Sequence, residues 1–175
     1  MARRIGAPDA KNRMALIDAA EALMIEDGYA AVTSRRVAEK AGLKPQLVHY
    51  YFRTMDDLFL AVFRRYADQG MAAHRHALES AQPLWALWRF GINPDASRLT
   101  MEMAALANHR KELRAEMSRY AELFREQQRE VFVTALQRHG VLPDEVPPIV
   151  WSILLTGVST VVMMGEALGV TAGHT

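Results

Sequence analysis

The stretch that decides the fold reads Thr33-Ser34-Arg35-Arg36-Val37-Ala38-Glu39-Lys40-Ala41-Gly42-Leu43-Lys44-Pro45-Gln46-Leu47-Val48-His49-Tyr50-Tyr51-Phe52. A cap at Thr33 or Ser34 starts a short helix, and Gly42 breaks it. Pro45 suits the first turn of a second short helix, because a proline lacks only an amide that would be unpaired there. The stretch therefore predicts a helix–turn–helix over 33–52.

The outward positions of these two helices carry hydrogen-bond donors and aromatic rings, and none of them is acidic. They are Arg35, Arg36, Lys44, Gln46, His49, Tyr50 and Arg53. A helix with such a face can enter a major groove and read base edges. The pattern predicts double-stranded DNA as a partner. The alternative is a solvated helical hairpin whose basic residues are accidental.

The charge distribution agrees with a DNA-facing front. The chain of 175 residues has a formal net charge of +1. Residues 1–66 hold 11 Lys and Arg against 8 Asp and Glu, whereas residues 67–175 hold 10 against 12. A basic N-terminal third on a mildly acidic body places the surface that attracts a polyanion at the front.

The rest of the chain has apolar residues at helical spacing and no persuasive strand, which predicts an all-α fold of about eight helices. We expect a three-helix N-terminal domain over 9–66, joined by a long fourth helix to a helical body over 67–168, with a frayed tail at 169–175. One stripe on a long helix that ends near residue 139 is formed by Leu113, Met117, Tyr120, Phe124, Gln127, Val131 and Ala135.

The last helix is unusually apolar, since 149–164 contains no charged residue. Sixteen residues fall short of the roughly 20 that span a bilayer, and no cluster of Lys or Arg flanks them. A helix that is apolar all round needs cover on all sides, so we expect no membrane span but a homodimer. The predicted interface comprises Val131, Ala135, Trp151, Leu155, Gly157, Val158 and Val162.

Aromatic and methionine side chains in the second half of the chain predict an apolar pocket for a small hydrophobic effector. The candidate lining residues are Trp85, Trp88, Met101, Met103, His109, Met117, Tyr120, Phe124 and Trp151. Taken singly, a methionine or tryptophan at helical spacing is better explained as plain core or a subunit interface.

Catalysis, metal binding and a cofactor are not expected. The chain has no cysteine, and it contains neither an HExxH or GxSxG motif nor a glycine-rich phosphate loop. His74 and His76 are two residues apart, so they point to different faces of a helix and do not form a zinc site. The N-terminus has no apolar signal segment, and the expected location is the cytoplasm.

Three ordered motifs also resemble a known family. "Ala-Leu-Met-Ile-Glu-Asp-Gly-Tyr" (22–29), "Thr-Ser-Arg-Arg-Val-Ala-Glu-Lys-Ala-Gly-Leu" (33–43) and "Tyr-Tyr-Phe-Arg-Thr-Met-Asp-Asp-Leu" (50–58) look like the N-terminal domain of tetracycline-repressor (TetR) family regulators. The resemblance covers roughly residues 12–66. It implies an all-helical homodimer whose two heads bind successive major grooves of a near-palindromic operator and which a small ligand releases.

The resemblance also assigns roles to residues. Ser34 resembles a phosphate contact and Arg35 a base contact, while Lys44, Pro45, Gln46 and Leu47 form the reading turn of the recognition helix. His49 occupies the place of the family's usual tyrosine, and Tyr50 follows it as a second reader. A repressor is implied, with an activator of the same fold or a helical protein–protein interaction module as alternatives.

Overall fold

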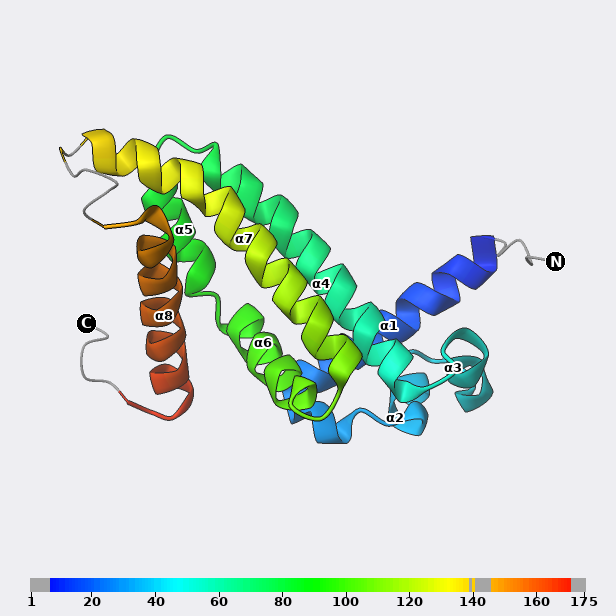
Figure 1. Cartoon of the computed structure of the whole chain (residues 1–175). Coiled ribbons are helices and arrows are strands. Elements are labelled where there is room, and N and C mark those ends of the chain that lie inside the picture. Colours follow the sequence, from blue (N-terminus) through cyan, green and yellow to red (C-terminus); the bar gives the residue numbers. More distant parts are fainter. Residues whose placement is uncertain (1–6, 139, 141–145, 171–175) are drawn as a thin grey trace. The chain divides into compact units, whose positions relative to one another are not determined.

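The computed structural model describes residues 7–138, 140 and 146–170 (Figure 1). These residues form α1 (Ala7–Asp27), the 3-10 helix η1 (Tyr29–Ala31), α2 (Ser34–Lys40), α3 (Pro45–Tyr51), α4 (Met55–Leu78), α5 (Pro83–Gly91), α6 (Pro94–Ala107), α7 (Lys111–Arg138) and α8 (Pro148–Ala167). The predicted all-α fold is confirmed. Of the predicted frayed tail, residues 171–175 lie outside the described part of the chain.

The chain divides into two compact units. The first contains the residues up to Tyr66 together with Arg98–Glu116, and the second contains Ala67–Ser97 and the residues from Met117 onward. Helices α4, α6 and α7 each contribute to both units.

The first unit has a core built from the apolar faces of α1, α2, α3, α4 and α6. Its fully buried side chains include Leu16, Met24, Val37, Val48, Leu58, Val62 and Leu106. On α1, Leu16, Ala20 and Met24 follow one another at four-residue intervals, which places them on one face of the helix. Burial of this face holds the two short helices α2 and α3 in place.

Polar contacts fix how α1 and α4 meet in this unit. Arg65 on α4 forms ion pairs with both Asp18 and Glu21 on α1. At the start of α4, the Asp57 amide donates to Thr54 Oγ1 at 3.1 Å and the Thr54 amide donates to Asp57 Oδ2 at 3.0 Å. This reciprocal cap satisfies two amides that the helix itself cannot pair.

In the second unit, α7 presents a wider inward face than the single predicted stripe. Gln128, Phe132 and Leu136 are buried, whereas Gln127 and Ala135, each one position earlier, are half-buried. Both rows face inward because α7 has neighbours on two sides, α4 and α8, and its glutamines bond to side chains of both.

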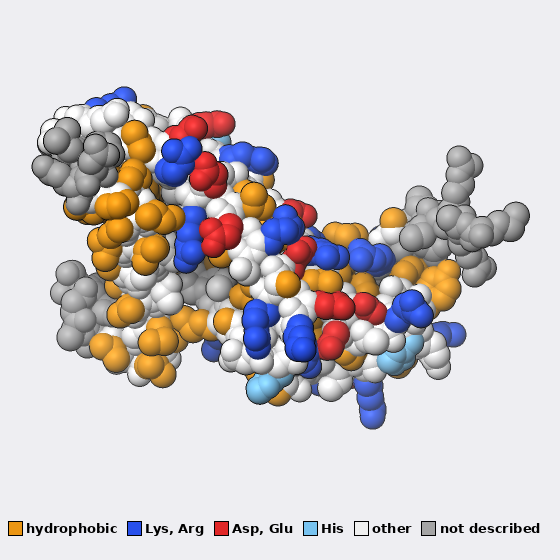
Figure 2. Space-filling view, in the orientation of Figure 1, with side chains coloured by type: hydrophobic (Ala, Val, Ile, Leu, Met, Phe, Trp, Pro, Cys, Tyr) orange, Lys and Arg blue, Asp and Glu red, His pale blue; other side chains and the backbone are white. Residues whose placement is uncertain are grey.

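Helix α8 buries small polar residues and exposes large aliphatic ones. Its buried side chains are Ser152, Ser159 and Met163. A Cβ added at Gly91 of α5 would lie 2.8 Å from Ser159 Oγ, so glycine there permits α5 and α8 to approach closely. Most of the large aliphatic residues of α8 are exposed, and Figure 2 shows hydrophobic side chains gathered over α8.

By length and composition, α8 is long and apolar enough to cross a membrane, since an 18-residue window of it has a mean hydropathy of 1.7, and no other described helix is. The helix has 20 residues, four more than the uncharged run, because it also includes Pro148 and 165–167. The prediction that this segment is too short to span a bilayer is therefore wrong, since the helix has the required length.

Candidate nucleic-acid interface

Helices α2 and α3 form a helix–turn–helix whose local bonds follow from the sequence. Thr33 caps α2, since its Oγ1 accepts from the Arg36 amide at 3.3 Å. Gly42 has a φ of +66°, a left-handed conformation that glycine adopts without a steric penalty. Pro45 occupies the first turn of α3. The Leu43 amide then donates to the Ala38 carbonyl at 2.9 Å, which closes the turn.

The interior of this motif is tightly packed with apolar side chains. Val37 and Ala38 of α2 are fully buried, and Val48 of α3 is 1% exposed. The ring of Phe52, directly after α3, is also buried and lies under the guanidinium of Arg13 from α1, 5.1 Å from the ring centroid. The inner face of α3 is therefore fixed, and its outer face is held in one orientation.

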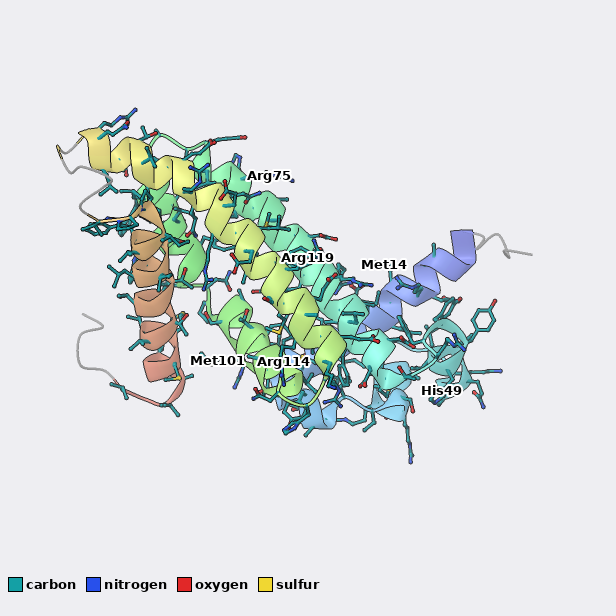
Figure 3. All side chains as sticks on the ribbon, in the orientation of Figure 1. Met14, His49, Arg75, Met101, Arg114 and Arg119 are labelled. Atoms are coloured by element: carbon teal, nitrogen blue, oxygen red, sulfur yellow. The ribbon has the colours of Figure 1, made fainter. Side chains whose placement is uncertain are left out.

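Most of the predicted DNA-contacting side chains are exposed together on this motif. They are Arg35, Arg36, Lys44, Pro45, Gln46, His49, Tyr50 and Arg53, with Ser34 and Leu47 half-buried. Figure 3 shows His49 among the side chains that project from α3. Tyr50 is 54% exposed and its ring stands edge-on to Tyr51, with the centroids 4.9 Å apart.

The arginines of α2 differ in their surroundings. Arg36 forms an ion pair with Asp27 at 2.5 Å, and Lys40 of the same helix pairs with Glu26 at 2.7 Å. Within the described part of the chain, no ion pair is formed by Arg35, Lys44 or Arg53. These three cations are available to a polyanion, whereas Arg36 is partly engaged in holding α2 to α1.

The predicted pocket residues are divided between the two units. Met101, Met103 and His109 group with the first unit, while Trp85, Trp88, Met117, Tyr120, Phe124 and Trp151 group with the second. Figure 3 places Met101 on α6. His109 is exposed at the turn after α6, and Trp85 is 57% exposed. The indole Nε1 of Trp151 is buried without a hydrogen-bond partner among the described residues.

The predicted dimer residues lie on two helices of the second unit. Val131 and Ala135 are half-buried on α7, and Trp151, Leu155 and Val162 are half-buried on α8. Gly157 and Val158 are exposed. The most exposed aliphatic row of α8 runs through Leu154, Val158 and Val161 and continues to Leu168, the C-cap residue directly after the helix. This row includes only part of the predicted set.

Sequence reasoning missed a buried polar relay in the second unit. Ser152 donates to Gln128 Oε1, Gln128 Nε2 lies 3.0 Å from His74 Nε2, and His74 Nδ1 lies 2.9 Å from Gln127 Oε1. The polarity is consistent for a neutral imidazole that carries its proton on Nδ1. Two adjacent glutamines on an otherwise apolar face were the available signal.

The ring of His74 is fully buried and is also held by aromatic contacts. Phe90 and Phe124 approach it edge-on, with centroid separations of 5.4 and 5.0 Å. A Cβ on Gly70, one turn earlier, would lie 3.4 Å from the tip of Phe124. Desolvation by this burial lowers the pKa of His74, and the hydrogen bond with Gln127 opposes the shift in part.

We expect acid to destabilise the second unit through His74. Because its folded pKa is lowered, the unfolded chain binds this proton more readily, and stability falls as the pH drops below about 6.5, the value in an unfolded chain. The slope for one proton is at most about 1.4 kcal/mol per pH unit. Urea unfolding between pH 7.5 and 5.0 measures it. The variant His74→Gln removes the titration, so an equal loss of stability in both proteins would contradict the assignment.

The geometry defines a helix–turn–helix motif with an exposed face of basic and aromatic side chains. The family model for bacterial regulatory proteins of the tetR family matches residues 16–62. Residues 16–62, which include the helix–turn–helix, are therefore similar to this family.

A curated protein is also similar to part of this chain. The HTH-type transcriptional regulator BetI of Rhizobium meliloti (strain 1021) is 33% identical over 87 residues, which are 47% of this chain and 43% of that protein. The chain is thus aligned with less than half of this curated relative.

Solved structures resemble nearly the whole fold. A putative transcriptional regulator from Saccharomonospora viridis in complex with choline has a TM-score of 0.77 at 18% identity, with 90% of this chain and 88% of that chain covered. A putative TetR-family regulator from Rhodococcus sp. has a TM-score of 0.76 at 19% identity, with coverage of 93% and 90%. At this identity the likeness establishes the fold, including the helical body beyond the head.

Proposed function

We propose that this protein is a DNA-binding transcriptional regulator that binds a near-palindromic operator as a homodimer and is released from it by a small effector. The observation that carries the proposal is the reading face of α3 and the start of α2, where Arg35, Lys44 and Tyr50 are exposed on a rigidly packed motif. Bidentate arginine contacts to guanine and donors near phosphates are the interactions that such a face can make.

Within this proposal, residues 9–66 are the DNA-binding domain and 67–168 the effector-binding and dimerising body. The contacts are those proposed from the sequence, with Arg35 reading bases and Ser34 binding phosphate. Asp27 and a DNA phosphate compete for the guanidinium of Arg36, because this side chain already forms an ion pair with Asp27.

The second subunit is proposed to cover α8. Val158 is 52% exposed, Val161 64% and Leu168 74%. A contiguous aliphatic row open to water is unfavourable in a monomer and is typical of an interface. The buried serines on the opposite face of α8 pack toward the protein's own chain, which supports a subunit interface over a membrane span.

The effector is proposed to bind in the body, near Trp88, Tyr120, Phe124 and Trp151. The indole N–H of Trp151 has no hydrogen-bond partner among the described residues, which supports a ligand that is mainly apolar but carries a hydrogen-bond acceptor. The similar structure of a putative transcriptional regulator in complex with choline makes choline a useful first probe. A cation such as choline binds over the face of an aromatic ring. Phe90 and Phe124 already pack on His74, and the Tyr120 ring already lies under Arg119. Apolar ligands that carry a hydrogen-bond acceptor are therefore tested beside choline.

A selection experiment tests the proposed function. Duplexes are selected from a random-sequence library with the purified chain, and binding to the enriched duplex is measured at several salt concentrations. We expect enrichment of a near-palindrome and an affinity that falls steeply with salt, because phosphate contacts release counterions. Absence of enrichment and of binding at low salt would favour a helical interaction module that does not contact DNA.

A further inference from the structure

Helix α6 supplies a hydrogen bond to the turn that precedes the helix–turn–helix. The backbone N–H of Tyr29 donates to Glu102 Oε2 at 2.7 Å, although the two residues are 73 positions apart. Both residues belong to the first unit. A bond from an amide to a carboxylate is charge-assisted and stronger than a neutral one.

The turn lacks a cap of its own. Gly28 joins α1 to η1 with a φ of +80°, and as a glycine it has no side chain that could accept from the first amides of η1. Such amides have no partner inside their own helix. The carboxylate of Glu102 therefore does what an N-cap side chain does elsewhere, from a different helix.

The capped turn determines where α2 begins. The Val32 amide donates to the Tyr29 carbonyl at 3.1 Å, and the Thr33 amide donates to the Ala31 carbonyl at 3.0 Å. Thr33 is the N-cap of α2. Only residues 30–33 separate Tyr29 from Ser34, and these backbone bonds hold them in place. A displacement of Tyr29 would therefore also displace Ser34 and Arg35, the first residues of the reading face.

Helix α6, which provides the cap, and the turn after it also bond to α4 and α7 within the first unit. Tyr66 and Thr100 share a hydrogen bond of 3.0 Å, and Arg110, just beyond α6, pairs with Asp56 of α4 at 2.6 Å. Arg114 of α7, labelled in Figure 3, donates to the Ala107 carbonyl at the end of α6 at 3.1 Å. The first turn of α6, residues 94–97, belongs to the second unit.

We propose that Glu102 is a positioning residue for DNA binding. It caps the turn before α2 from a helix that also continues into the second unit, so the register of Arg35 on DNA depends on where α6 lies. This inference rests on the DNA-binding function proposed above.

The experiment compares Glu102→Ala, Glu102→Gln and the control Glu112→Ala. Glu112 is an exposed acid in the first turn of α7, so its removal changes the net charge equally without touching the turn. Amide exchange at Tyr29 is measured by NMR. Affinity is measured for the selected duplex and for a scrambled duplex of equal length.

For Glu102→Ala we expect faster exchange at Tyr29 and an affinity for the selected duplex about five- to tenfold weaker, the loss that a missing cap produces. Affinity for scrambled DNA should match that of Glu112→Ala. Glu102→Gln keeps an acceptor oxygen and should lie between Glu102→Ala and wild type in both measurements.

Two results would overturn the proposal. Unchanged exchange at Tyr29 in Glu102→Ala would show that the carboxylate does not cap this amide. Faster exchange with full affinity for the selected duplex would show that the cap is structural only. If the wild-type protein binds no duplex, the proposed function fails together with the positioning role, while the exchange data still report whether the cap exists.

Discussion

Replacing Val158 by aspartate is expected to convert the protein to a monomer and to weaken operator binding by about two orders of magnitude. Val158 lies midway along the exposed row of α8, between Leu154 and Val161. A carboxylate there would be buried without a partner when two copies associate, which is strongly unfavourable. Two linked heads bind one operator far more tightly than a single head, by a factor of about 10²–10⁴.

Sedimentation velocity and a titration with the selected duplex measure the two effects. Because Val158 is half exposed in the single chain, the substitution should leave the monomer folded. Thr160→Asp is the matched control, since it places the same charge two residues further along α8 at an exposed polar position off the row. A Val158→Asp protein that remains dimeric, or a Thr160→Asp protein that is equally monomeric, would contradict this interface.

Substitutions on the reading face are expected to have the second largest effect. Arg35→Ala and Tyr50→Ala should each weaken binding to the selected duplex by about 1–3 kcal/mol. Both side chains are exposed, so thermal unfolding should change little. Arg35 has no ion pair within the described residues, and its full charge is therefore available for a bidentate contact with guanine.

Lys40→Ala is the control for charge on the same helix, because its ammonium is held by Glu26. We expect it to change affinity only slightly, and Arg36→Ala to fall between Lys40→Ala and Arg35→Ala. Binding is compared with that of a scrambled duplex at the same salt concentration. Unchanged affinity in both Arg35→Ala and Tyr50→Ala would disprove the proposed docking of α3.

Most of the fold could be predicted because its signals are local. The cap at Thr33, the left-handed Gly42 and Pro45 at the start of α3 each act within a few residues, and the structure places all three as expected. The helical spacing of apolar residues along the rest of the chain likewise predicted the all-α fold. The reading face followed directly, since an outward position on a short helix is determined by its period.

The partners of individual side chains could not be predicted in the same way. The bond between Glu102 and Tyr29 and the bonds of His74 with Gln127 and Gln128 join residues more than 50 positions apart. No helical or strand period relates such residues, so their proximity depends on how whole helices pack. The same reason separates Arg36, which pairs with Asp27, from the adjacent Arg35.

The sequence alone therefore determined the helices, the helix–turn–helix of 33–52 and the residues on its outward face, because capping, glycine conformation and apolar periodicity are properties of neighbouring residues. Only the tertiary structure decided which of those cations are engaged, which side of the apolar α8 is exposed and which distant carboxylate caps the turn before α2. These features depend on helix packing, which brings together groups that local sequence patterns leave unrelated.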